Sequence, residues 1–429
     1  MEKIRYENPI GESYIKAVLP SGLSVYIMEK PRYSSAYAVF GTKYGSIDTM
    51  FSKNGEEMIT VPEGIAHFLE HKLFESEDGD AFTRYAQTGG YANAFTSFDR
   101  TCYLFSCSDR FYDNLEILLD FVQHPYFTEE TVAKEQGIIG QEIRMYDDSP
   151  SWRVMFNMLD CMYHNHPVKI DIAGTVDSIA KIDAKLLYDC YDTFYNPSNM
   201  FICVVGNVDS EKVLKQIEAS IIDKPPVTIE RGEFSEPQGV VSNYVEQSLE
   251  VAMPMFCYGY KQKIGSPNRR LKSKVCASLL LELICGEASP LYARLIREGL
   301  INDEFGTEYF TGHGYAAVIF EGESTNPKRV AEEISKEIER IRVEGIDKKL
   351  LSAVRCGMYG DAIRRFNSVE GLAMQLIECA MTDSDLFEEL KLLRSVTAED
   401  VYKRLDLFDA DNAVLSVIKP KTEEKTNGL

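Results

Sequence analysis

Two of the six histidines stand four residues apart in the run His67-Phe68-Leu69-Glu70-His71. On a helix, side chains at positions i and i+4 share one face, so both imidazoles can bind the same metal ion. Glu70, three residues after His67, can reach that face as well. A zinc ion held by neutral imidazoles lowers the pKa of a water ligand toward neutrality, and a nearby carboxylate can take the water proton. The spacing therefore predicts hydrolysis at a zinc centre.

A catalytic zinc ion needs a third protein ligand that leaves a fourth position open. The predicted helix over 128–146 offers Glu135 and Glu142, which are seven residues apart and share one stripe. The sequence alone does not bring that stripe to the histidines. Four carboxylates in a charged, loop-like stretch compete for the same role: Glu75, Glu77, Asp78 and Asp80.

Two other interpretations of the histidine pair stay open. In the first, His67 and His71 are half-buried side chains that only pack in a core, and Glu70 is solvated. In the second, the zinc is purely structural. Two histidines with one carboxylate fit a structural site poorly, because such sites favour cysteine and four protein ligands.

Hydrophobic periodicity predicts the elements that must position these residues. In the first half, strands are expected over 22–28, 35–40, 91–98, 101–107 and 200–205, and helices over 62–74, 81–88, 111–123, 128–146, 152–163 and 184–194. The second half repeats this order with a strand over 249–260, helices over 271–285 and 290–298, strands over 304–310 and 315–321, further helices, and a closing strand over 413–418. The repeated order favours an internal duplication of an α/β unit.

Composition sets the class of protein. The chain has 429 residues, of which 45% are hydrophobic and 26% are charged, as expected for two globular domains. A stretch rich in proline and charge predicts a linker over 223–247, between a zinc-binding domain over 1–222 and a second domain over 248–420; a loose tail follows over 421–429.

Charge and cysteine usage indicate the surroundings. The net charge of −21 disfavours a nucleic-acid partner and favours basic peptides. We expect no membrane span, because no apolar run approaches the length of one. The N-terminus does not have the pattern of a signal peptide, and the ten cysteines form no CxxC pair. We therefore expect a reduced, cytoplasmic protein.

The stretch GIAHFLEHKLF over 64–74 resembles the inverted zinc signature of the inverzincins, the pitrilysin/insulinase-type metallopeptidases. The likeness spans most of residues 40–210, and the second half matches more weakly in layout. It is carried by GSID (45–48), ANAFTSFDRT (92–101), EQGIIGQEIRMYDDSP (135–150), HPVKIDIAGT (166–175) and YNPSNMFICVVGNVD (195–209). Within the family, the chain is most similar to the zinc-bearing member of paired small bacterial peptidases.

This resemblance implies that His67, His71 and Glu142 are the zinc ligands and that Glu70 is the general base. It implies that Glu135 orients a ligand imidazole or tunes its basicity. The implied fold class is α/β (α+β), with two related domains that each contain a mixed β-sheet with helices packed against it. Family members enclose peptides in a chamber of four such domains. This chain supplies two, so a homo- or heterodimer with a related chain is expected.

The family's edge strand implies that Asn93 and Ala94 bind the backbone of an extended peptide by β-augmentation. The alternative for Asn93 is a strand-end turn. We expect Thr96 and Thr101 to be ordinary strand residues.

The second half departs from the family at one point. Arg297 fits an arginine that holds the substrate carbonyl, but Glu304 stands seven residues later, where the family often has tyrosine. Either another group makes this contact, the partner chain included, or the enzyme is slow or specialised; Arg297 can equally be a surface helix residue. The resulting prediction is a zinc-dependent endopeptidase. The alternative is a non-catalytic subunit that binds peptides or serves assembly.

Overall fold

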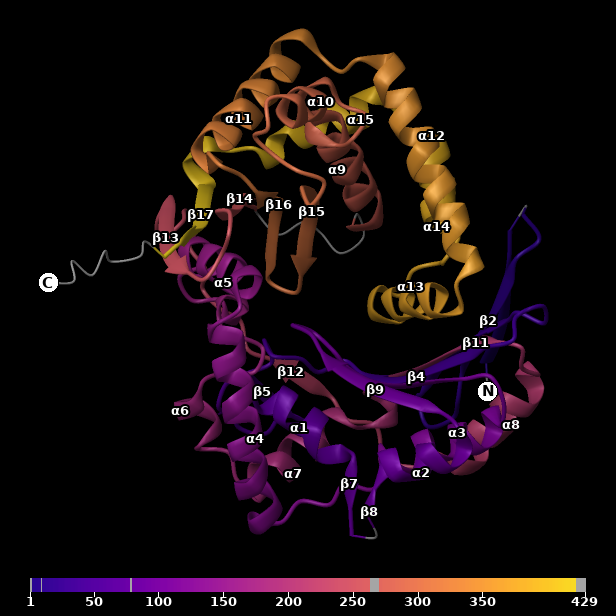
Figure 1. The fold of residues 1–429 in the computed structure, drawn as a ribbon. Helices are drawn as coiled ribbons and strands as arrows, with labels where there is room; N and C mark the ends of the chain where they lie inside the picture. The colour runs from indigo at the N-terminus through magenta and orange to yellow at the C-terminus, as the bar shows by residue number, and fades with distance from the viewer. Residues whose placement is uncertain (1, 9, 78, 263–269, 422–429) are drawn as a thin grey trace, which may run out of the picture. The chain divides into compact units, whose positions relative to one another are not determined.

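The computed structural model describes residues 2–8, 10–77, 79–262 and 270–421, and Figure 1 draws their fold. Two compact units interleave along the chain. The first unit comprises Met1–Ile143, Asp171–Glu233 and Asp361–Glu388, and the second comprises Arg144–Ile170, Phe234–Gly360 and Glu389–Leu429. The tail predicted over 421–429 lies outside the described residues from residue 422 onward.

A seven-stranded sheet in the order β1-β2-β3-β11-β4-β10-β9 forms the centre of the first unit. Its strands are β1 (Glu2–Glu7), β2 (Ser13–Val18), β3 (Ser24–Glu29), β4 (Ala36–Thr42), β9 (Tyr91–Thr96), β10 (Thr101–Cys107) and β11 (Met200–Gly206). Strands β3 and β11 pair in parallel, and the other neighbours pair antiparallel. Every residue of β4 and β11 is buried, so both faces of the sheet are covered at its centre.

Helices cover both faces of this sheet. In Figure 1, α13 lies on one face, and α1, α2, α3, α7 and α8 lie on the other. The helices of the unit are α1 (Ile65–Leu73), α2 (Ala81–Thr88), α3 (Phe111–Phe121), α4 (Glu129–Asp147, which ends in the second unit), α6 (Val176–Ile179), α7 (Ala184–Phe194), α8 (Ser210–Ser220) and α13 (Val369–Thr382). The minor strands are β5 (Met50–Lys53), β6 (Ile59–Thr60), β7 (Glu75–Ser76), β8 (Gly79–Asp80) and β12 (Ile229–Arg231).

The second unit contains a five-stranded sheet in the order β13-β17-β14-β16-β15. Its strands are β13 (Tyr244–Leu249), β14 (Met255–Lys261), β15 (Gly306–Gly312), β16 (Tyr315–Glu323) and β17 (Ala413–Pro420). Its helices are α5 (Pro150–Met162), α9 (Arg270–Cys285), α10 (Pro290–Arg297), α11 (Pro327–Glu344), α12 (Lys348–Arg364, which ends in the first unit), α14 (Glu388–Ser395) and α15 (Ala398–Tyr402). Across both units, short 3₁₀ helices span Pro167–Lys169, Pro197–Asn199, Arg365–Asn367, Lys403–Leu407 and Ala410–Asn412.

The two sheets share one topology, which confirms the predicted fold class of two related mixed-sheet domains. The order β3-β11-β4-β10-β9 corresponds strand for strand to β13-β17-β14-β16-β15, and the first pair is parallel in both. Helix α9 takes the place in the second unit that α1 takes in the first: each follows the second of the five strands along the chain and precedes the third and fourth. It carries no histidine, so the HxxEH motif belongs to the first unit alone.

Each unit also takes one helix from the other half of the sequence. Helix α13 packs against β3, β4 and β11 of the first unit, and α5 packs against β13, β14 and β17 of the second. Arg100, at the end of the β9–β10 turn, forms an ion pair of 2.7 Å with Glu378 of α13. The division into 1–222, a linker over 223–247 and 248–420 stays a prediction, because the compact units exchange these two helices.

Two sequence expectations differ from the structure in detail, and one hairpin had no expectation. Helix α1 begins at Ile65 rather than near residue 62, because Gly64 adopts a left-handed conformation (φ 87°) that directs the chain into the helix. A Cβ atom there would lie 2.3 Å from the carbonyl oxygen of Ala173, so only glycine fits. The single strand expected over 249–260 is two strands, β13 and β14, separated around Pro254. The N-terminal hairpin β1–β2 was not expected.

No single helix among the described residues is long and apolar enough to cross a membrane. The bent pair Leu271–Cys285 and Pro290–Arg297, at 43°, passes the same test by length and composition only.

The segment Gly45–Asp48 holds the turn between β9 and β10. The amide of Ser46 donates to the carbonyl oxygen of Ser97 (3.0 Å), and the amide of Ile47 donates to that of Phe98 (3.0 Å). A Cβ atom on Gly45 would lie 2.4 Å from the carbonyl carbon of Phe98. Backbone atoms cannot move aside as a flexible side chain can, so this close approach requires glycine.

We therefore expect Gly45→Ala to lower the free energy of unfolding by about 1–3 kcal/mol, because the new methyl group overlaps the turn backbone. Urea denaturation measures the change. Gly137→Ala is the matched control, since no atom lies within 4 Å of a Cβ built at that helical glycine. The control is expected to be neutral or stabilising, by up to about 1 kcal/mol. An equal loss of stability in both variants would contradict the packing argument.

A half-buried carboxylate anchors the predicted linker inside the second unit. Glu236 accepts hydrogen bonds from the main-chain amides of His164, Asn165 and His166 (2.9, 2.7 and 2.9 Å) and from Nζ of Lys261 (2.6 Å). Burial raises the pKa of Glu236, but these four donors outweigh it and lower the pKa to about 2. The ionised carboxylate therefore stabilises the fold.

Because the folded-state pKa of Glu236 lies below the unfolded one, this stabilisation is present at neutral pH and is lost as the pH falls from about 5 toward 2. Glu236→Gln is expected to lower the free energy of unfolding by about 2–3 kcal/mol at pH 7 and by less at each step below about pH 5. Urea titrations from pH 7 to pH 3 measure both values. The exposed Glu230→Gln is the control. A pH-independent difference would contradict the assignment.

Candidate metal centre

Helix α1 buries His67 and Glu70, and it carries His71 half-buried. His67 is 7% exposed and Glu70 is 9% exposed. The centroids of the two imidazole rings lie 4.6 Å apart, as the i, i+4 spacing predicts. Helix α1 packs against β9 and β10 of the sheet, so the face with the histidines is held in a fixed position.

Helix α4 brings the third residue. Oε1 of Glu142 lies 3.8 Å from Nε2 of His67, and Oε2 lies 3.3 Å from Nε2 of His71. One ligand atom from each of these three residues lies within 4.8 Å of the other two, close enough to share a metal ion. Among the competing carboxylates, Glu75 instead pairs with Lys72.

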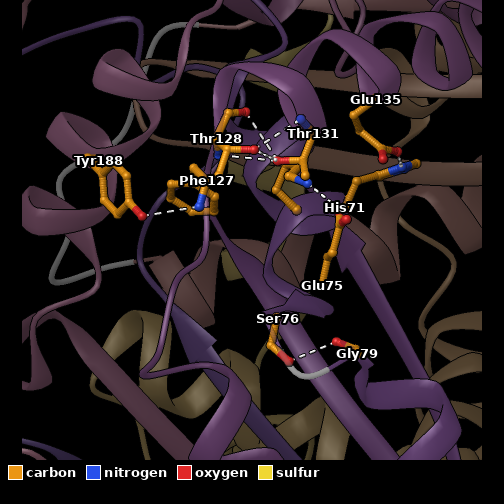
Figure 2. Close-up of polar contacts among 10 residues, drawn as sticks. His71, Glu75, Ser76, Gly79, Phe127, Thr128, Thr131, Glu135 and Tyr188 are labelled. Atoms are coloured by element: carbon orange, nitrogen blue, oxygen red, sulfur yellow. Dashed lines mark hydrogen bonds and ion pairs between the residues drawn. The ribbon is translucent and has the colours of Figure 1, made fainter.

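Glu135 lies two turns before Glu142 on α4 and points toward His71, as Figure 2 shows. Its Oε1 lies 2.9 Å from Nδ1 of His71. A carboxylate accepts and does not donate, so Nδ1 carries a proton toward Glu135, and Nε2 is the ring nitrogen that faces Glu142. By contrast, Nδ1 of His67 is buried and has no hydrogen-bond partner within the described part of the chain.

The site concentrates negative charge around two imidazoles. Burial, followed by the neighbouring His71, lowers the pKa of His67 to about 4, so that ring is neutral at pH 7. Burial opposes the charged form of His71 as well, but Glu135 and Glu142 outweigh it and raise its pKa to about 10. Burial also raises the pKa of Glu70. A divalent cation among these groups would replace the proton on His71 and offset the carboxylate charge. Two imidazoles with one carboxylate suit zinc.

Thr96 is a residue of this site that the sequence analysis missed. Its Oγ1 donates a hydrogen bond of 2.6 Å to Oε2 of Glu70. Thr101, opposite Thr96 on β10, donates to the carbonyl oxygen of Tyr44 (2.9 Å). Thr96 lies in β9 as expected of a strand residue, and its hydroxyl also contacts Glu70. The only sequence signal was its place in the segment ANAFTSFDRT (92–101), which shares the family resemblance.

Asn93 and Ala94 lie in the middle of β9, at one end of the sheet order. Asn93 is exposed, and its Oδ1 accepts from the amide of Ala94 (2.9 Å). The alternative of a strand-end turn for Asn93 is therefore wrong. Arg297 is exposed at the last residue of α10, and Glu304 precedes β15, both in the second unit. The role of Arg297 in holding a carbonyl stays a prediction.

Known proteins resemble both halves of this chain. A family model described as "Insulinase (Peptidase family M16)" matches residues 60–176, and one described as "Peptidase M16 inactive domain" matches residues 181–357. The chain is 41% identical over 429 residues to the "Uncharacterized zinc protease YmfH" of Bacillus subtilis, covering 98% of this chain and 100% of that one. The chain belongs to the M16 peptidase family.

Solved structures of M16 proteins share its fold. A crystal structure of an M16-like protein from Alicyclobacillus acidocaldarius has a TM-score of 0.92 and 33% identity, covering 97% of this chain and 100% of that one. A structure titled as a peptidase M16 inactive domain from Pseudomonas fluorescens has a TM-score of 0.78 and 13% identity, covering 95% and 98%. At that identity the likeness shows the fold alone.

The contact between Glu135 and His71 generates a prediction about metal affinity. Glu135→Gln removes the charge that fixes and polarises the imidazole, so we expect zinc to bind about 10-fold to 100-fold more weakly. Competition with a chromophoric chelator measures this affinity. Glu130→Gln, an exposed position in the first turn of the same helix, is the matched control and should bind zinc as the parent does. Unchanged affinity in Glu135→Gln would refute the orienting role.

Proposed function

We propose that this M16 protein is a zinc-dependent endopeptidase. The observation that carries the proposal is the convergence of His67, His71 and Glu142, with Glu70 on the same helical turn as His71. The family membership and the name of the relative YmfH support the same class of reaction.

The residues present fit a zinc ion. His67, His71 and Glu142 would hold it, and Glu135 would keep the His71 imidazole in the ligating tautomer. When bound, zinc polarises the scissile carbonyl and makes water more acidic. Three protein ligands leave a coordination position for substrate, unlike closed structural sites with four.

Glu70 performs the proton transfers in this proposal. As a carboxylate it takes a proton from the attacking water, and as a carboxylic acid it returns that proton to the leaving amine. The water oxygen forms a bond to the carbonyl carbon, the C–N bond breaks, and Glu70 ends as it began. Burial raises the pKa of Glu70, which favours holding the proton between the two steps.

Strand β9 supports the binding of an extended peptide. It is last in the sheet order, so one edge has backbone groups that pair with no other strand among the described residues. In the proposal, a substrate adds a strand along Asn93 and Ala94 through main-chain hydrogen bonds. Such bonds depend little on the identity of the substrate side chains, so other contacts would set the cleavage preference.

Assembly and location are further parts of the proposal. We propose a homo- or heterodimer with a related chain, and we keep the cytoplasm as the predicted location. The specific alternative is a non-catalytic subunit that binds peptides, favoured by the inactive-domain model over residues 181–357 and by Glu304 in place of tyrosine. Retention of the whole HxxEH motif argues against it.

Glu70→Gln tests the proposal. The amide cannot accept the water proton, so we expect peptide hydrolysis to fall by at least about 10³-fold while one zinc per chain stays bound. A quenched fluorescent peptide library and metal analysis measure the two quantities.

Two controls accompany this variant. His71→Ala is expected to lose both zinc and activity, and the parent protein should lose activity on chelation and regain it with zinc. Peptide hydrolysis at the parent rate in Glu70→Gln would refute the role of Glu70. A zinc-loaded parent that hydrolyses no peptide, alone or with a related chain, would favour the non-catalytic alternative.

A further inference from the structure

We propose that Thr96 is a positioning residue for Glu70. By occupying Oε2 of the carboxylate, it leaves Oε1 as the oxygen that exchanges protons. The inference rests on the proposed function, because it concerns how Glu70 acts as the base.

The hydrogen bond itself is short and enclosed. Thr96 Oγ1 lies 2.6 Å from Oε2 of Glu70, and the Glu70 residue is only 9% exposed. The Thr96 hydroxyl therefore supplies a hydrogen bond to a buried carboxylate, in addition to a backbone hydrogen bond from the same residue, which a substitution of the side chain would leave in place.

The number of available hydroxyl protons fixes the direction of the hydrogen bond between Thr96 and Glu70. A hydroxyl group has a single proton. Thr101, which is fully buried, gives its proton to the carbonyl oxygen of Tyr44 at 2.9 Å, so toward Thr96 its oxygen can only accept. The Thr96 hydroxyl can donate its proton either to Oγ1 of Thr101 at 3.4 Å or to Oε2 of Glu70 at 2.6 Å. The shorter, charge-assisted contact is stronger, so Thr96 donates to Glu70.

This hydrogen bond gives the two oxygens of Glu70 different roles. In the hydrolysis, an O–H bond of water breaks as its oxygen bonds to the carbonyl carbon, and the proton arrives on Oε1. The Oε1–H bond then breaks as the leaving amine gains that proton. Throughout, Oε2 accepts from Thr96, so the carboxyl group cannot rotate between the two transfers and present the wrong oxygen.

The strand backbone keeps Thr96 in place. Thr96 is the last residue of β9 and lies opposite Thr101 in the register with β10. The turn that follows is closed by a hydrogen bond from the amide of Ser97 to the carbonyl oxygen of Arg100 (2.8 Å). The hydroxyl of Thr96 is thus preorganised, which is what a positioning group requires.

Thr96→Val and Thr96→Ser test the inference in the zinc-loaded protein. Valine keeps the shape without the hydroxyl, and serine keeps the hydroxyl. We expect Thr96→Val to lower kcat about 10-fold to 100-fold, with KM within about 2-fold and zinc content unchanged. Thr96→Ser should recover kcat to within about 3-fold of the parent. Thr193→Val is the matched control, because it removes another buried hydroxyl, bonded at 2.7 Å to the carbonyl of Asp189, and should leave kcat unchanged.

A second readout needs no activity. In chelator-treated, metal-free protein, Thr96→Val should lower the Tm by about 2–4 °C when Glu70 is present and by clearly less in a Glu70→Ala background. Equal shifts in both backgrounds would overturn the inference, because they would show that the hydroxyl stabilises the fold without bonding to Glu70.

The outcomes separate this inference from the proposed function. If Glu70→Gln retains peptide hydrolysis, the proposed role of Glu70 is wrong, and the inference about Thr96 that rests on it is wrong as well. If Glu70→Gln is inactive but Thr96→Val keeps the parent kcat, or Thr96→Ser is no better than Thr96→Val, the inference about Thr96 fails alone. Loss of kcat with serine rescue and coupled Tm shifts would support it.

Discussion

The approach of α4 to α1 at one point is the interaction on which the site depends. The helical repeat sets His67 and His71 on one face, and the same repeat sets Glu135 and Glu142 on one stripe. Only where these two surfaces meet do both Nε2 atoms face one carboxylate. A shift of either helix by one residue would turn these side chains away, so the packing of α1 on β9 and β10 is part of the chemistry.

Local sequence patterns predicted the features that depend on residues close together along the chain. The i, i+4 histidines, the stripe of Glu135 and Glu142 and the order of strands and helices follow from periodicity. The meeting of α1 with α4 is a long-range contact, and only the family resemblance pointed to it. Thr96 was missed because a threonine at a strand end is common, and its meaning depends on the register that sets it opposite Thr101 and beside Glu70.

The two units show that this fold does not require the metal motif. Their sheets share five strands in one order and direction, yet α9 carries no histidine. Buried positions of α9 such as Leu279, Leu280 and Ile284 pack as a core helix does. The sheet topology is therefore maintained by the burial of apolar side chains, and the metal residues are an addition to one copy.

Helices α5 and α13 each pack in the unit that is formed mostly by the other half of the chain, so the order of synthesis affects folding. The strands β3, β4 and β11 leave the ribosome long before residues 369–382, the helix that covers one of their faces. Until then an apolar surface of the first sheet has no cover, and such surfaces attract chaperones or other nascent chains. A fragment that stops after the first half would contain the HxxEH helix and its sheet without that cover, so the first unit is complete only when the second half has been made.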